Sequence, residues 1–320
     1  MRRLLPLALV LTFTTTVFAA DDVIRKGFNV SEGGTLRLDA DLGGIKVVSG
    51  GTGVSIEITR KADGRRGAES LADHRITFRQ DGNDVIIEDE LPANRTRFFW
   101  SDDYDVQWNV RVPARYNLQL RTSGGGIELA NIGGTVDVRT SGGSITTGTL
   151  GRDSVLKTSG GAIRVAAANG AIDARTSGGS IDIGATTGRV EARTSGGSIK
   201  LASSGGDVIA KTSGGNIRID GAAGMVDAST SGGSIHATLT RQAAADSSLT
   251  TSGGNVTVMV SRGVGAEVDA RASGGSVVSD LPITVQGSVD KDELHGTLNG
   301  GGPRLVLRSS GGSVRLRSAE

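Results

Sequence analysis

The sequence predicts an all-β fold, a parallel β-solenoid of the β-helix or β-roll kind, with 18-residue coils of two strands each and an N-terminal β cap. Three observations lead to this fold. The tetrapeptide TSGG begins at positions 122, 140, 158, 176, 194, 212 and 230, which makes six consecutive intervals of eighteen residues. Apolar and polar residues alternate between these corners. The 50 glycines accompany only 5 prolines, which excludes a collagen repeat.

The first segment, residues 1–19, is expected to be a signal peptide. Arg2 and Arg3 precede an apolar stretch from Leu4 to Phe13, and small residues follow at the expected cleavage position. The apolar run is shorter than the roughly 20 residues that cross a bilayer. We therefore expect an exported, soluble protein of the periplasm or the cell surface, without a transmembrane segment.

The charge balance and the lack of cysteine exclude several classes of protein and of binding site. Removing the two arginines of the leader from the 35 basic residues leaves 33, against 34 acidic ones. A nearly neutral chain lacks the bulk positive charge of a nucleic-acid-binding protein. The absence of cysteine excludes disulfides, a thiolate zinc site and a lipid on an N-terminal cysteine. We expect no cofactor, and stability from many repeated hydrogen bonds.

Residues 20–121 are predicted to form the N-terminal β cap, continuous with the first irregular coils. The β-type stretches are residues 35–48, 54–59, 74–90 and 104–121, the third with a hairpin turn at residues 81–84. Seven of the eight aromatic residues that follow the leader lie between Phe78 and Tyr116. An open solenoid end exposes a strand edge that invites polymerisation, so a bulkier end is expected.

Residues 122–247 are predicted to be the regular repeats, each made of a corner, a short strand, a weaker turn and a second strand. The first strand carries Ile127, Ile145, Ile163, Ile181, Ile199, Ile217 and Ile235 at one position. The second carries Val136, Ile172, Val190, Val208 and Val226, followed two residues later by Val138, Leu156, Ala174, Ala192, Ala210 and Ala228. Period two within a strand indicates one buried face.

The corner itself is predicted to be structural rather than a ligand loop. A chain that reverses within four residues is expected to need positive φ, which glycine adopts without steric cost. The threonine before the glycines falls on the inward side of the strand, where its hydroxyl can bond along the column or to the turn. One coil cannot fold alone. Each buried Val or Ile contributes roughly 1.5–3 kcal/mol, whereas ordering the backbone costs about 1–2 kcal/mol for every residue of the coil.

Residues 248–320 are expected to form irregular C-terminal coils and a closing strand. The corner returns as TSGG at position 251, ASGG at 272 and SSGG at 309, with longer spacers.

Three parts of the sequence resemble the bacterial putative-adhesin family of β-strand-repeat, GIN or head-domain-like envelope proteins. They are the phrase VRVPARYNLQLRTSGGGIEL, the serial TSGGSI coils and the terminal LNGGGPRLVLRSSGGSVRL. The resemblance covers nearly all of the chain after the leader. It implies a parallel β-solenoid exported to the cell envelope with an adhesive role, and it offers no catalytic residues to transfer.

Two groups of residues are candidates for ligand contact. Outward positions of the second strand hold a basic column of Arg121, Arg139, Lys157, Arg175, Arg193 and Lys211. This column is either a polyanion site or, since acids stand two residues before each of Arg139, Arg175 and Arg193, a surface ion-pair lattice. The lattice is the favoured interpretation.

The second group is an aromatic and acidic patch made of Trp100, Asp102, Asp103, Tyr104 and Trp108. Its rings could stack on sugars while the carboxylates accept hydrogen bonds from hydroxyl groups. All three rings share one face of an extended strand, which suits a place in the core of the cap equally well, and the cap core is the favoured interpretation.

The sequence therefore predicts an exported, non-enzymatic β-solenoid that serves as a structural or adhesive surface in the bacterial cell envelope. Envelope glycans or other surface polymers are the expected partners, and the oligomeric state is left open. The three histidines stand in no metal-binding or triad spacing. The alternative is a glycan-binding or polysaccharide-cleaving β-helix that uses the aromatic and acidic patch.

Overall fold

The computed structural model describes residues 20–62, 74–90, 104–285 and 290–319. These residues form 29 β-strands and no helix, so the all-β prediction is confirmed for the described part of the chain. Nothing in this part is a helix long and apolar enough to cross a membrane. The expected signal peptide lies outside the described residues.

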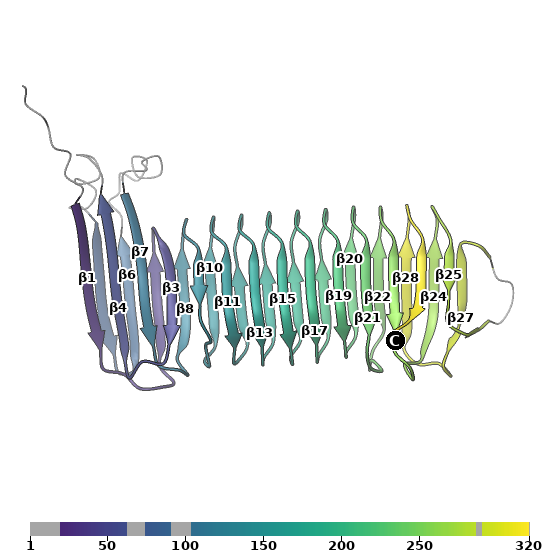
Figure 1. Ribbon diagram of the computed structural model, residues 1–320, viewed down its shortest axis with the longest axis horizontal. Coiled ribbons are helices and arrows are strands. Elements are labelled where there is room, and N and C mark those ends of the chain that lie inside the picture. Colours follow the sequence, from purple (N-terminus) through teal and green to yellow (C-terminus); the bar gives the residue numbers. More distant parts are fainter. Residues whose placement is uncertain (1–19, 63–73, 91–103, 286–289, 320) are drawn as a thin grey trace, which may run out of the picture.

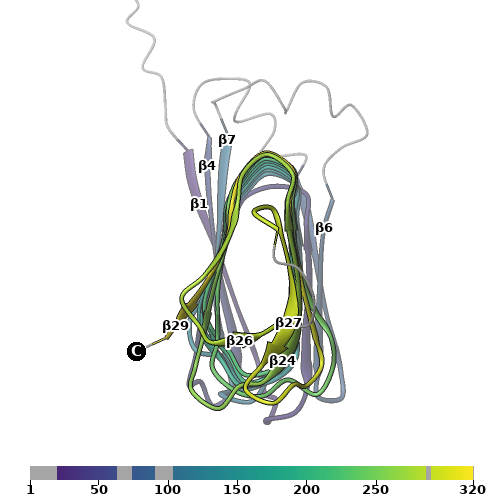
Figure 2. The ribbon, with the colours of Figure 1, turned by 90° about the vertical axis from the view of Figure 1, so that its right-hand side faces the viewer.

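Strands of the repeats alternate between two long sheets, named sheet 1 and sheet 2. Sheet 1 receives β9 (Ile127–Leu129), β11 (Ile145–Leu150), β13 (Ile163–Ala168), β15 (Ile181–Thr186), β17 (Ile199–Ser204), β19 (Ile217–Ala222), β21 (Ile235–Leu239) and β23 (Val256–Val260). Sheet 2 receives β8 (Asn117–Thr122), β10 (Val136–Thr140), β12 (Ser154–Lys157), β14 (Ile172–Arg175), β16 (Val190–Arg193), β18 (Val208–Lys211), β20 (Val226–Thr230) and β22 (Ser247–Thr251). The chain thus winds around a shared interior, across which the two sheets face each other in Figure 2.

Neighbouring strands of the repeats are parallel and in register. In sheet 1 Ile145 pairs with Ile163, eighteen positions further along the chain. In sheet 2 Val190 pairs with Val208 at the same interval. Strands that are adjacent in the stack of Figure 1 therefore carry equivalent residues of consecutive repeats. Two long, mostly parallel sheets of this kind are compatible with the predicted solenoid.

The interior contains the residues that the alternation predicts. The isoleucines at the start of the sheet 1 strands, from Ile127 to Ile235, are at most 2% exposed. The Val, Ile, Leu and Ala residues predicted to face inward from sheet 2 are equally buried. They belong to one continuous hydrophobic core that runs along the whole stack. The predicted inward columns are therefore confirmed.

The corner glycines are required for a different reason from the one predicted. The prediction of positive φ is wrong, because none of the glycines in the TSGG corners from 122 to 251 adopts it. A Cβ on the second glycine of a corner would instead collide with the corner before it. At Gly179 it would lie 2.0 Å from the carbonyl oxygen of Gly161, and at Gly197 it would lie 2.1 Å from that of Gly179. Glycine is needed because consecutive corners stack backbone on backbone.

The corner threonines bond both along the column and to the turn, as predicted. The Thr194 hydroxyl donates to the carbonyl oxygen of Gly179 in the preceding corner at 2.8 Å and accepts from the N–H of Gly197 at 3.3 Å. The N–H of Gly196 donates to the carbonyl of Ser177 at 2.9 Å. These groups are satisfied within the stack, so they do not form an anion-binding loop.

The N-terminal segment supplies seven strands. They are β1 (Ala20–Phe28), β2 (Thr35–Ala40), β3 (Gly44–Ser49), β4 (Val54–Ala62), β5 (Arg75–Asp81), β6 (Asp84–Glu90) and β7 (Tyr104–Val112). β2 and β3 continue the stack of repeats, since Leu36 pairs with Leu118 and Ile45 pairs with Ile127. Beyond this layer, sheet 1 ends with β7, β4 and β1, and sheet 2 ends with β6 and β5.

The outermost strands close the N-terminal end of the core. β5 and β6 form the predicted hairpin, in which Asp81 pairs with Asp84 and Gly82 has a φ of 56°. The ring of Phe28 in β1 lies 6.5 Å from that of Phe78 in β5, centroid to centroid. The two sheets therefore meet through aromatic side chains at this end.

The C-terminal segment does not follow chain order in the stack. Its strands are β24 (Ala266–Ala272), β25 (Val277–Ser279), β26 (Ile283–Thr284), β27 (Glu293–Leu298), β28 (Arg304–Ser309) and β29 (Val314–Ser318). β28 lies between β22 and β24, and β29 lies between β23 and β25. The last strands of the chain thus form an inner layer, and β24 to β27 lie outside them, as the right-hand end of Figure 1 shows.

Ion pairs fasten this inserted layer. Asp269 of β24 accepts hydrogen bonds from Arg308 at 2.6 Å and from Arg304 at 3.0 Å, both in β28. The imidazole Nδ1 of His295 lies 3.1 Å from the same carboxylate. Burial would raise the pKa of Asp269, but hydrogen bonding from Arg308 and the charges of Arg308 and His295, helped by Arg304, hold it below its ordinary value.

Candidate ligand surfaces

A basic row runs along the outer surface of sheet 2. It consists of Arg121, Arg139, Lys157, Arg175, Arg193 and Lys211, each paired in register with the next. Neighbouring strands lie about 4.8 Å apart, so like charges recur at that spacing. The structure therefore brings together all six residues of the basic column considered from the sequence.

Carboxylates on the same surface neutralise much of this row. Glu191 lies 2.6 Å from Arg175 and 2.9 Å from Arg193. A third guanidinium, that of Arg189, lies 3.5 Å away. The hydrogen bond from Arg193, together with the three positive charges, lowers the pKa of Glu191 despite its burial. The hydrogen bond to Asp173 is the main reason why the pKa of Arg175 is raised.

Three of the four remaining members of the row are also in ion pairs. Further pairs join Arg121 to Asp39 at 3.9 Å, Arg139 to Asp137 at 2.9 Å and Lys211 to Asp227 at 2.7 Å. Lys157 makes no ion pair with a described carboxylate, and the position two residues before it is Val155. Exposed pairs of this kind contribute about 0.2–1 kcal/mol each. Five of the six basic residues are thus in ion pairs, the arrangement that the lattice interpretation expects.

The aromatic and acidic patch falls only partly within the described residues. Trp100, Asp102 and Asp103 lie outside them, and Tyr104 is the first residue of β7. Trp108 is fully buried, and its indole N–H donates to the carbonyl of Leu42 at 3.0 Å. It shares the inward side of β7 with the valines on either side. This burial corrects the ligand-platform hypothesis at Trp108, because a buried ring cannot stack on a sugar.

The three histidines occupy unrelated places. His74 is buried against Asp89 in the N-terminal segment, and His295 lies beside Asp269 at the other end of the stack. His236 lies in β21, where burial and then the charge of Arg218 lower its pKa. Within the residues that the structure describes, no three His, Asp or Glu side chains gather as a metal site.

A groove on the outer surface of sheet 1 was missed by sequence reasoning. Its volume is about 600 Å³, and it is lined by residues of β1, β3, β4 and β7. The basic side chains that line it on the outward face are Arg25, Lys46 and Arg111, and the described lining includes one carboxylate, Glu57. We call it the basic groove. Its residues come from four separate segments, so only the outward position of each within its own strand could have pointed to them.

Comparisons with known proteins give a likeness of structure alone. No family model matches the chain, and no curated protein is similar to it in sequence. A solved structure of a putative adhesin from Bacteroides fragilis is 14% identical, with 93% of this chain and 97% of that chain covered, at a TM-score of 0.35. A putative adhesin from Parabacteroides merdae is 12% identical, with 92% and 95% covered, at a TM-score of 0.35.

A putative cell adhesion protein from Clostridium sporogenes is 10% identical, with 94% of this chain and 100% of that chain covered, at a TM-score of 0.24. The solved structures that resemble the chain are thus named as putative adhesins, the kind of protein that the sequence resembles. TM-scores this low carry no conclusion about function, which has to be inferred from the surfaces of the protein itself.

Proposed function

We propose that the protein is an exported, non-enzymatic rod of 18-residue coils, with residues 20–121 as its N-terminal β cap. It serves as a structural or adhesive surface in the bacterial cell envelope. The register of the two sheets carries this proposal, because equivalent residues of consecutive repeats meet along the stack (Figure 1). Each outward position thereby becomes a row of side chains with a spacing of about 4.8 Å.

Rows of this kind suit many weak contacts with a repeating polymer. Each contact adds little, but contacts made by one rigid body reinforce one another through effective concentration. The corners keep the rows in fixed positions, since Thr194 and its equivalents bond each corner to the one before. A fixed array loses little conformational entropy on binding. Envelope glycans and other surface polymers are the proposed partners.

The ionisable groups favour a non-enzymatic role. General acids and bases work best when their pKa lies near the working pH. Among the described groups, the pKa values of Glu191 and Asp269 are lowered, that of His236 is lowered from 6.5, and burial, reinforced by Asp84, raises that of Tyr116 to about 12. Structural ion-pair networks shift pKa values as well, and Glu191 and Asp269 both stand in such networks.

The test combines location with multivalency. Cells that express the full chain are fractionated, and the purified protein is sedimented with envelope fragments. Deleting residues 158–193 removes two repeats and joins Lys157 to Thr194 without changing the repeat frame. The proposal predicts export, envelope binding, and a fall in affinity for the shortened rod that exceeds the share of length removed.

Retention of the full chain in the cytoplasm would contradict the proposed export. Equal binding by the long and the short rod would contradict multivalent contact. Release of new reducing ends from envelope polysaccharide would favour the alternative of a polysaccharide-cleaving β-helix.

A further inference from the structure

We infer that the basic groove binds an acidic oligosaccharide, a chain of sugars that carry carboxylates. The inference deepens the adhesive role proposed above and rests on it for its biological meaning. It assigns a ligand class to one place on the rod, whereas the rows of the repeats offer contacts without a pocket.

The shape of the groove suits an elongated ligand. One row of outward residues crosses it in register, from Arg25 in β1 through Glu57 in β4 and Asn109 in β7 to Lys46 in β3. Three strand spacings of about 4.8 Å separate the ends of this row. The strands β1, β4 and β7 lean relative to the repeats in Figure 1. A site that extends across four strands fits several linked sugars better than one small ion.

The charge of the groove is positive and only partly neutralised. Glu57 binds Arg25 at 2.7 Å, and Lys46 lies 3.8 Å from Glu128, both of them weak surface contacts. Arg111, one strand away from Lys46, makes no ion pair with a described carboxylate. Its guanidinium is available for a bidentate contact with a carboxylate, the geometry in which arginine binds most strongly.

Lys26 lies at the edge of the groove, but its side chain is on the inward face of β1, where it pairs with the buried Ile56. Its ammonium group lies 5.8 Å from the centroid of the Phe78 ring, and it also has no ion pair with a described carboxylate. The three cations on the outward face, Arg25, Lys46 and Arg111, therefore exceed the one described carboxylate of the groove by two. This excess attracts an anion.

Uncharged lining groups favour a sugar acid over a bare phosphate chain. Asn109 and Ser55 offer donors and acceptors for hydroxyl groups, while the half-buried Val48 offers an apolar contact for the C–H face of a sugar. Gly27 adds no side chain to this lining, and a Cβ there would meet nothing within 4 Å. Closely spaced phosphates would meet the carboxylate of Glu57, whereas sugar hydroxyls can donate to it.

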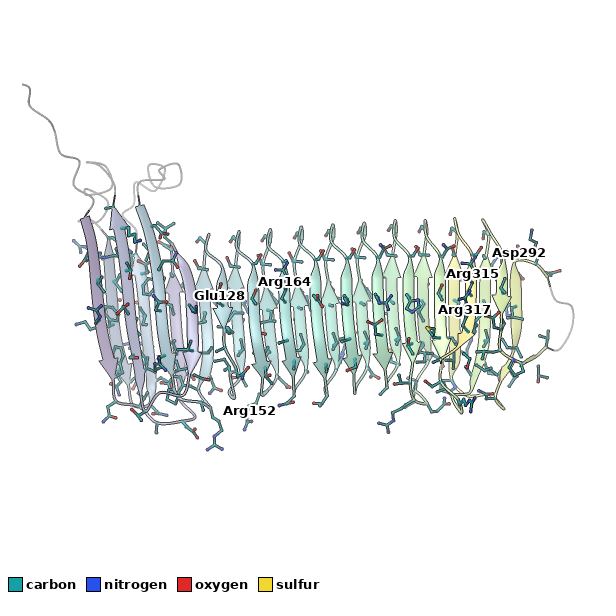
Figure 3. The ribbon with its side chains drawn as sticks, viewed as in Figure 1. Glu128, Arg152, Arg164, Asp292, Arg315 and Arg317 are labelled. Atoms are coloured by element: carbon teal, nitrogen blue, oxygen red, sulfur yellow. The ribbon has the colours of Figure 1, made fainter. Side chains whose placement is uncertain are left out.

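The experiment measures binding of oligogalacturonate to the purified full-length protein by calorimetry at low and high salt. Arg111→Gln removes the unpaired guanidinium, and Arg111→Gln/Lys46→Gln removes two cations. Arg164→Gln is the matched control: Arg164 is exposed on β13 of the same sheet, lies outside the groove (Figure 3) and makes no ion pair with a described carboxylate. Circular dichroism verifies that each variant is folded.

We expect Arg111→Gln to weaken binding about tenfold or more, the usual effect of losing a charge-assisted hydrogen bond. The double variant should bind more weakly still, and Arg164→Gln should bind as the wild type does. Unchanged affinity in folded Arg111→Gln would overturn the inference, as would an equal loss in Arg164→Gln. Tighter binding of polyphosphate than of oligogalacturonate would replace the sugar acid by a phosphate polymer.

Failure of the groove and failure of the adhesive role give different results. If Arg111→Gln binds envelope fragments as well as the wild type does and oligogalacturonate does not bind, the groove assignment falls and the adhesive rod stands. If oligogalacturonate binds in the groove but envelope fragments are not retained, the adhesive role falls instead.

Discussion

A methyl group added to the second glycine of a corner should destabilise the stack far more than one added to the first. A Cβ at position 179 would lie 2.0 Å from the carbonyl oxygen of Gly161 and 2.4 Å from its carbonyl carbon. At position 178 the nearest atom would be the carbonyl oxygen of Gly160, 3.3 Å away. Neither glycine has positive φ, so the two substitutions differ only in what the new methyl group meets.

The magnitude follows from these contacts. Non-bonded carbon atoms pack at about 3.5–4.0 Å, so Gly179→Ala must push two corners apart by more than one ångström. Overpacking of a tight interior costs about 1–3 kcal/mol. The same movement stretches the 2.8 Å bond from Thr176 to Gly161, which is worth roughly 1 kcal/mol. We expect a loss of about 2–4 kcal/mol for Gly179→Ala and less than about 1 kcal/mol for Gly178→Ala.

Urea unfolding followed by circular dichroism measures both variants against the wild type. A domain is typically stable by about 5–15 kcal/mol, so the predicted loss for Gly179→Ala is a large share of the total. The reasoning is refuted if the two variants unfold at the same urea concentration, or if Gly178→Ala is the weaker one. Either result would mean that consecutive corners do not stack as closely as described.

Three further substitutions test other contacts. Thr194→Val keeps the shape of the side chain but removes its hydrogen bonds to Gly179 and Gly197, so the free energy of unfolding measured in urea should fall by about 1–3 kcal/mol. The control is Thr146→Val, which replaces an exposed threonine and should unfold as the wild type does. The folded pKa of Asp269 lies below its ordinary 3.8, so this carboxylate stabilises the fold above that pH and the contribution is lost as the pH falls through the folded pKa. Asp269→Asn should therefore lower the urea midpoint at neutral pH and flatten its decline in acid, and a parallel decline in both proteins would contradict this. Glu191→Gln breaks pairs with Arg175 and Arg193 on a partly exposed surface, so its effect on the thermal midpoint should correspond to about 1 kcal/mol and shrink in high salt; a large, salt-independent loss would show that the lattice is more than a surface feature.

The sequence predicted the interior of the repeats well because a period of two leaves little choice. Ile163 and Ile181 must face the same way as their equivalents, and a strand shifted by one residue would place them all in solvent. The reason for the corner glycines was missed because a collision between successive corners depends on their stacking distance. A single corner, read on its own, indicates only a turn.

The order in which the strands stack at the two ends could not be predicted from the sequence. Residues 35–48 stack on the first repeat although 82 positions separate Leu36 from Leu118, and the phrase LRLDADLGGIKV does match LQLRTSGGGIEL in its apolar positions. Several coils with the same pattern could occupy that layer, and only packing of the intervening strands decides among them. The basic groove was unpredictable for the same reason, since Arg25 and Lys46 line one surface only through that packing.

The aromatic and acidic patch shows what the alternation of residues within one strand cannot predict. Alternation in β7 places Trp108 with Val106 and Val110, all three buried. The same alternation would hold if that face of β7 were open to solvent. Which face of a strand becomes the interior is decided by the second sheet, and residue spacing within one strand does not report it.

The inserted C-terminal layer has a consequence for how the molecule is completed. A growing chain that has reached Ala272 has already made every regular repeat, yet the place between β22 and β24 stays vacant until residues 304–318 exist. Residues 304–318 therefore complete the stack only after the segments on either side of them exist. Before these residues dock, β22 and β24 each have an edge without a partner strand. Once they dock, β28 pairs with both edges.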